Sequence, residues 1–147
     1  VADIGDASKV PLPVDISITS DDQGLWVDTF MDGKARYFDI SDPFNPVQKY
    51  EETIGSQVNM ISQSWDGKRA YFSTSLLGNW DKTGDADEQW VKLYEWDDES
   101  LELSHKWTID FYKEKLGRAH QMRFGAKALY ANLLPRSEPT NVASLQR

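Results

Sequence analysis

Apolar and polar residues alternate along two short segments, residues 60–64 and 69–75, which are separated by the turn Trp65-Asp66-Gly67-Lys68. The first segment is half apolar, and the second is rich in aromatic and hydroxyl side chains, as is typical of strands. Asp-Gly between two such segments is a strong hairpin signal, because glycine supplies the positive φ that the turn requires. We therefore predict a β-hairpin in this part of the chain.

The same pattern recurs along the chain. Residues 16–30 align with residues 59–75, so that Ser20 matches Ser64, and residues 34–43 align with residues 91–100. A third, weaker copy begins at residue 120. Each unit consists of strand, polar turn, strand, loop, strand, acidic turn and strand. This order, repeated about every 40 to 50 residues, is typical of the blades of a β-propeller.

We predict an all-β fold of propeller blades. A partial β-propeller spans residues 1–134, with blade repeats near 14–55, 56–111 and 118–134, and residues 135–147 form a C-terminal loop or tail. A single antiparallel sandwich is the alternative, because all hairpins share similar turn chemistry. Propellers close with about four to eight blades. The sequence accounts for two to three blades. We therefore predict that the remaining blades of the propeller come from another chain or from a missing N-terminal part.

Composition narrows the class of protein. Aromatic residues make up 12% of the 147 residues, which suits sheets that pack through large flat side chains. The net charge of -8 argues against a nucleic-acid partner, which needs a basic face. No apolar run approaches the roughly 20 residues of a membrane-spanning helix. The chain has no cysteine, so it contains no disulfide and no thiol nucleophile.

Two histidines and one acidic loop are candidates for chemistry. His105 alternates with polar neighbours on a strand, so we expect it at a surface edge. His120 stands where the chain enters an innermost strand, and such positions face the channel mouth where propellers bind ligands and metals. Asn59 also precedes an inner strand. The acidic loop 81–89 lacks the spacing of a helix-flanked calcium loop, so we expect it to be solvated.

Three segments resemble a known family. They are "YFDISDPFNPV" (residues 37–47), "MISQSWDGKRAYFSTSLLGNWDK" (residues 60–82) and "IDFYKEKLGRAHQMRFG" (residues 109–125). In this order they are similar to the C-terminal portion of the selenium-binding protein family, whose bacterial members include methanethiol oxidases. The resemblance covers residues 14–125 and is greatest to the bacterial branch, because the chain lacks the long insertion of animal members.

The resemblance implies a seven-bladed propeller and copper-dependent oxidation of methanethiol by dioxygen and water to formaldehyde, hydrogen sulfide and hydrogen peroxide. His120 matches the histidine of the family's L-G-x-x-H motif and is the expected copper ligand. Imidazole suits both copper oxidation states. Trp80 and Asp81 match the family's W-D-K motif and, with Asn59, are candidates for the substrate pocket. The other ligands and a characteristic cysteine lie in upstream family segments, so the catalytic residues stay unknown.

Two alternatives stay open at this stage. One is a non-catalytic propeller fragment that serves as a protein-binding scaffold, and the other is a related copper enzyme that acts on another small sulfur compound. Copper loading and a diffusible thiol suit the bacterial periplasm, with the cytoplasm as the alternative location.

Overall fold

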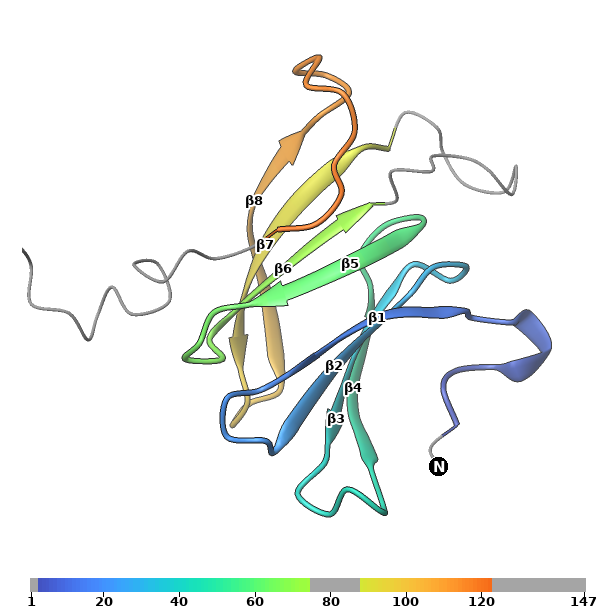
Figure 1. Ribbon diagram of the computed structural model, residues 1–147, viewed down its shortest axis with the longest axis vertical. Helices are drawn as coiled ribbons and strands as arrows, with labels where there is room; N and C mark the ends of the chain where they lie inside the picture. The colour runs from blue at the N-terminus through green and yellow to red at the C-terminus, as the bar shows by residue number, and fades with distance from the viewer. Residues whose placement is uncertain (1–2, 75–87, 123–147) are drawn as a thin grey trace, which may run out of the picture.

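Two antiparallel sheets of four strands each make up the fold (Figure 1). The computed structural model describes residues 3–74 and 88–122. Within those ranges the only helical element is the three-residue 3-10 helix Ala7–Lys9. The first sheet contains β1 (Pro13–Ile18), β2 (Gly24–Thr29), β3 (Lys34–Asp39) and β4 (Val47–Thr53). The second contains β5 (Val58–Gln63), β6 (Arg69–Thr74), β7 (Trp90–Asp97) and β8 (Glu102–Asp110).

Each sheet is a simple meander, in which every strand pairs with the next strand in sequence. The predicted hairpin is confirmed as β5 and β6, and Gly67 in its turn has the expected positive φ of 70°. The first strand of each sheet also carries a register shift at the same place, between Pro13 and Asp15 in β1 and between Val58 and Met60 in β5. The two sheets are therefore two copies of one unit, as the sequence repeat predicts.

The core lies between the facing sides of the two sheets. Trp26 of β2 is fully buried, and its ring centroid lies 5.8 Å from that of Phe72 and 4.9 Å from that of Trp96, both in the second sheet. Such edge-to-face contacts are favourable for aromatic rings. The two inner strands β1 and β5 lie side by side, and the outer strands extend away from them (Figure 1). This face-to-face packing of consecutive meanders is the arrangement of propeller blades.

Polar contacts join the two inner strands directly. The backbone N–H of Ile61 donates to Asp15 Oδ2 at 3.1 Å, and Gln63 Nε2 donates to Ser17 Oγ at 2.8 Å. At the hairpin end, Ser20 Oγ donates to the carbonyl oxygen of Trp65 at 2.8 Å. These contacts fix how the second blade sits against the first, and so they place the residues where β5 begins.

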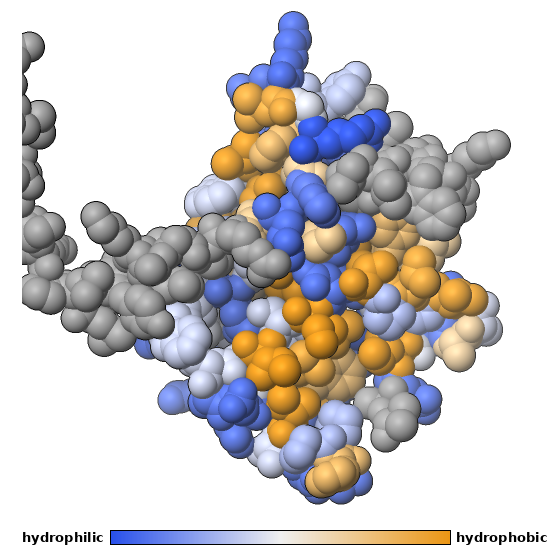
Figure 2. All heavy atoms as spheres, in the orientation of Figure 1, coloured by the Kyte–Doolittle hydropathy of each residue, from blue (hydrophilic) through white to orange (hydrophobic). Residues whose placement is uncertain are grey.

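The other face of the first sheet is only partly covered. Backbone hydrogen bonds hold Pro11 and Leu12 beside the end of β2. The side chains of Val14, Ile16 and Ile18 on β1 nevertheless stay 41%, 58% and 52% exposed. Figure 2 shows apolar atoms in a band that follows β1 across the viewed face. The innermost strand therefore presents an apolar surface away from the core.

Candidate functional site

The candidate site residues that the structure describes lie at one end of the second sheet. β5 begins at Val58, which pairs with Thr74 at the end of β6. The segment that follows β8 meets the start of β7 at the same end, where the N–H of Phe111 donates to the carbonyl oxygen of Gln89 at 2.7 Å. Because the strands alternate in direction, the connections into β5 and out of β8 converge there.

His120 lies on the segment that leaves β8. This connection starts with a turn in which the N–H of Leu116 donates to the carbonyl oxygen of Phe111 at 2.9 Å, and Gly117 then takes a φ of 86°. A residue at positive φ ends helical geometry, so the chain continues without forming a regular helix. Ala119 is 2% exposed, whereas the side chain of His120 is exposed. The backbone is thus anchored against the blade while the imidazole stays accessible.

Two serines of the second blade bind this segment. Ser73 Oγ donates to the carbonyl oxygen of His120 at 2.5 Å, and Ser62 Oγ donates to the carbonyl oxygen of Met122 at 2.9 Å. Ser73 is fully buried and lies on β6, while Ser62 lies on β5. The two bonds fix the backbone on both sides of Gln121.

Asn59 lies in the irregular part of β5, between Val58 and Met60, and is half-buried. Met60 pairs with Ser73, the residue that binds the His120 carbonyl. The structure therefore places Asn59 and His120 at the same end of the same hairpin, and a shared role in a pocket stays a prediction. Trp80 and Asp81 lie outside the described residues.

Only the end of the acidic loop is described, at Glu88 and Gln89. Glu88 accepts hydrogen bonds from the backbone N–H of Ser56 at 3.0 Å, from the Ser56 hydroxyl, and from Trp90 Nε1 at 2.7 Å. Its carboxylate joins the loop before β7 to the connection between the two blades. We assign Glu88 a structural role, which sequence reasoning missed.

Asp28 is a buried acid that sequence reasoning also missed. It is fully buried on β2, Oδ1 accepts from the backbone N–H of Asp15 at 2.9 Å, and no described residue bonds Oδ2. Burial raises the pKa of Asp28 to about 8, and the nearby Asp15 carboxylate adds to the rise. An aspartate within the strand sequence "GLWVDT" is the one signal that could have identified it.

His105 is on the surface, as its sequence context predicts. It lies on the outer strand β8, is exposed, and its Nε2 is 2.9 Å from Thr108 Oγ1. Its ring packs edge-on against Tyr94 at 5.3 Å between centroids. We assign it no chemistry.

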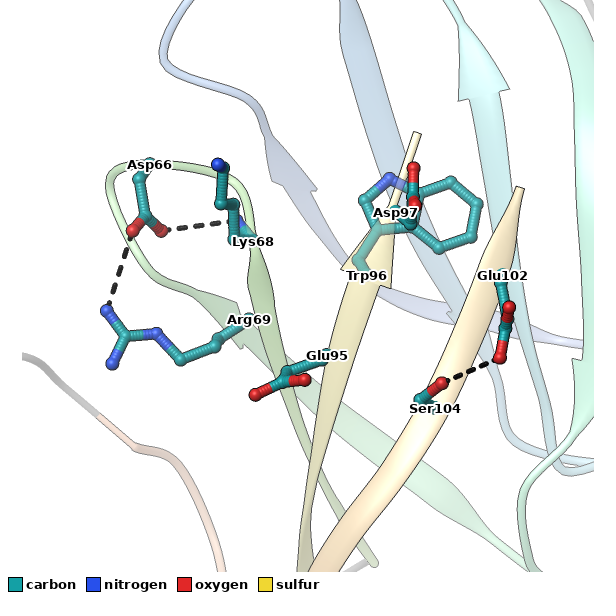
Figure 3. Close-up of a pocket in the computed structure, with 8 residues that line it drawn as sticks. All are labelled: Asp66, Lys68, Arg69, Glu95, Trp96, Asp97, Glu102 and Ser104. Carbon is teal, nitrogen blue, oxygen red and sulfur yellow. Dashed lines mark hydrogen bonds and ion pairs between the residues drawn. The ribbon is translucent and has the colours of Figure 1, made fainter. Parts of the chain in front are cut away.

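An open cleft of about 520 Å³ lies at the opposite end of the second sheet, beside the β5–β6 turn (Figure 3). Two ion pairs form at this cleft: Arg69 pairs with Asp66 at 3.6 Å, and Glu95 pairs with Lys106 at 2.7 Å. The lining residues are Asp66, Lys68, Arg69, Glu95, Trp96, Asp97, Glu102 and Ser104. This cleft is separate from the end that carries His120.

The described residues do not form a complete metal site by themselves. Within residues 3–74 and 88–122, no three side chains of histidine, aspartate or glutamate gather closely enough to hold an ion. The exposed imidazole of His120 is a donor type that copper accepts. The donor chemistry of this side chain fits copper, and the assignment of His120 as a ligand stays a prediction.

Comparison with known proteins identifies the family. The sequence model of the 56kDa selenium binding protein family matches residues 3–128. The chain belongs to this family. It is 61% identical over 132 residues to the methanethiol oxidase of Ruegeria pomeroyi, and the match covers 90% of the chain and 30% of that relative. The predicted resemblance is thereby confirmed, and the chain spans about a third of a curated member of the selenium-binding protein family.

Solved structures support the propeller fold. A hypothetical selenium-binding protein from Sulfolobus tokodaii superposes with a TM-score of 0.58 at 28% identity, over 69% of the chain and 26% of that structure. The β-propeller domain of Swd1 from Myceliophteria thermophila superposes with a TM-score of 0.51 at 12% identity, over 67% and 28%. The prediction of an all-β fold of propeller blades is confirmed. In the described part, no helix has the length and apolar character needed to cross a membrane.

Proposed function

We propose that this chain forms the C-terminal part of a copper-dependent methanethiol oxidase. The reaction converts methanethiol, dioxygen and water to formaldehyde, hydrogen sulfide and hydrogen peroxide. The observation that carries the proposal is the 61% identity to a methanethiol oxidase, across a region in which His120 stands exposed on an anchored backbone.

In this proposal His120 is a copper ligand. Copper held there would supply redox chemistry and would lower the pKa of a thiol substrate that binds it. His120 presents its imidazole, because the segment that carries it is bonded to the second blade through Ser62 and Ser73. Asn59 lies at the same end of the hairpin, and in this proposal it contacts the substrate.

The proposal also requires further blades, because the described residues supply one candidate ligand. The exposed apolar side chains of β1 give those blades a surface to pack against. We propose that they belong to the same complete propeller, whose channel mouth brings the remaining ligands to His120.

Replacing His120 tests this function. In the full-length protein, we expect His120→Ala to lower bound copper and methanethiol-dependent oxygen consumption by more than about 100-fold, since a lost ligand should cost more than the 10–100-fold typical of an outer-shell partner. Copper is measured by elemental analysis and oxygen with an electrode.

His105→Ala is the matched control, because His105 is exposed on an outer strand and should leave both quantities unchanged. An unaltered protein that binds copper but consumes oxygen only with another small sulfur compound would reject methanethiol as the substrate. Full copper and activity in His120→Ala would reject His120 as a ligand.

A periplasmic location is part of the same proposal, since copper loading and a diffusible thiol suit that compartment. Fractionation of the source cells tests it. Recovery of the full-length protein with a cytoplasmic marker would count against this location.

A further inference from the structure

The bond from Ser73 to His120 differs from what the repeat provides in the first blade. In β1 and β5 the register shift falls at the same place. Asp15, the first paired residue after the shift in β1, pairs with Asp28, and Met60, its counterpart in β5, pairs with Ser73. Asp28 and Ser73 are thus equivalent, and both are fully buried. Asp28 accepts a bond from Asp15 of its own blade, whereas Ser73 donates to the next segment of the chain.

The other serine contact follows the repeat. Ser62 occupies the position in β5 that Ser17 occupies in β1, since each is the third paired residue after the register shift of its strand. Ser17 accepts from Gln63 of the next blade, and Ser62 donates to Met122. In both blades this serine therefore bonds a later segment of the chain, whereas the Ser73 hydroxyl has no counterpart in the first blade.

The Ser73 hydroxyl acts on the backbone of His120 itself. Its bond ends on the carbonyl oxygen of His120, and the preceding residue, Ala119, is buried against the blade. These two anchors restrict the position of the His120 Cα and therefore the volume that the imidazole can reach. Groups that orient a metal ligand contribute to metal affinity even though they do not touch the metal.

We infer that Ser73 is a positioning residue for the copper site, which orients His120 through its carbonyl group. This inference rests on the proposed function, because it assumes that His120 binds copper. In the first blade, Asp28 at this position makes no such bond, since its Oδ1 accepts from the N–H of Asp15 and no described residue bonds its Oδ2. The serine is therefore the feature that adapts this blade to hold a ligand at its edge.

The test measures copper affinity in the full-length protein by competition with a copper chelator, together with the electron paramagnetic resonance spectrum of the bound copper(II). We expect Ser73→Ala to weaken copper binding about tenfold and to alter the spectrum. We expect Ser73→Thr, which keeps the hydroxyl, to retain the unaltered affinity. Should Ser73→Ala fail to fold, the comparison of Ser73→Thr with Ser73→Val replaces it, since these two side chains have nearly the same shape and differ in the hydroxyl.

Ser17→Ala is the matched control, because it removes a serine contact between blades that does not end on the segment carrying His120, and it should leave copper affinity and spectrum unchanged. Equal affinity and spectra in the unaltered protein and Ser73→Ala, with copper binding lost in His120→Ala, would overturn the role of Ser73 alone. Unchanged copper binding in His120→Ala would overturn the ligand assignment and this inference with it.

Discussion

At the scale of single residues, Asp28 links the stability of the fold to pH. Burial raises the pKa of its carboxyl to about 8, compared with an ordinary value of 3.8. Between these values the folded chain keeps a proton that the unfolded chain releases. The free energy of unfolding therefore falls as pH rises from about 4 to about 8, and this contribution is fully lost above pH 8. Asp15 is the charged group that packs against Asp28 and adds to the effect.

We predict that Asp28→Asn reduces this pH dependence, because the amide keeps an acceptor for the Asp15 N–H but does not titrate. The fall in the free energy of unfolding between pH 5 and pH 8 should be smaller by an amount on the order of 4 kcal/mol. Denaturant unfolding of the full-length protein at several pH values measures it. Asp98→Asn, on an exposed turn, is the control. Matching pH profiles for Asp28→Asn and the unaltered protein would contradict the assignment.

At the scale of elements, the β5–β6 turn is held by local contacts. Asp66 Oδ1 accepts from Ser64 Oγ at 2.5 Å and from the Lys68 N–H at 3.1 Å, and Gly67 has a φ of 70°. A Cβ at Gly67 would meet no atom within 4 Å, so a substitution there strains the backbone alone. We predict that Gly67→Ala lowers the free energy of unfolding by about 1 kcal/mol, and that Gly67→Asn costs less because asparagine tolerates this conformation. Equal losses in the two variants, measured by denaturant unfolding, would contradict this explanation.

The same hairpin shows which features the sequence could predict. Its turn depends on residues 64–69, so neighbouring residues contain the whole signal. The anchoring of this segment depends on Ser73, which lies 47 residues before His120, and on Ser62, which lies 60 residues before Met122. A motif could select His120 but could not indicate which side chains hold its backbone. Nor could alternation alone predict the register shifts in β1 and β5, which set the equivalence of Asp28 and Ser73.

At the scale of the whole molecule, the repeat predicted more than the composition did. Aromatic content indicated a sheet protein, but the alignment of Ser20 with Ser64 predicted two similar units. The structure corrects that alignment by one residue, because Thr19 and Ser64 make the same turn contacts, with Asp21 and Asp66. The structure adds how they meet, through Trp26, Phe72 and Trp96 between the sheets. Contacts of this kind join strands of different blades, and no local pattern specifies which aromatic rings face each other.

The repeat also predicts how the first blade is covered in the full-length protein. Ile16 and Ile61 hold equivalent positions, since each is the second paired residue after the register shift in its strand. Their exposure differs, because the side chain of Ile61 is 3% exposed and that of Ile16 is 58% exposed. Ile61 packs in the core shared with the preceding sheet. We therefore expect another blade to cover Ile16 in the same way. Ile16→Ser should then lower the free energy of unfolding of the full-length protein by about 2–4 kcal/mol, as for truncation of a buried aliphatic side chain.

Val47→Ser is the matched comparison for Ile16→Ser, because Val47 is 50% exposed on the outer strand β4. A surface substitution of that kind should change the free energy of unfolding by no more than about 0.5 kcal/mol. Denaturant unfolding of both variants separates the two environments. Small and equal effects would mean that β1 stays open to solvent in the full-length protein. A large effect at Ile16 alone would place a further blade against β1, since exposure in the present structure is similar for both side chains.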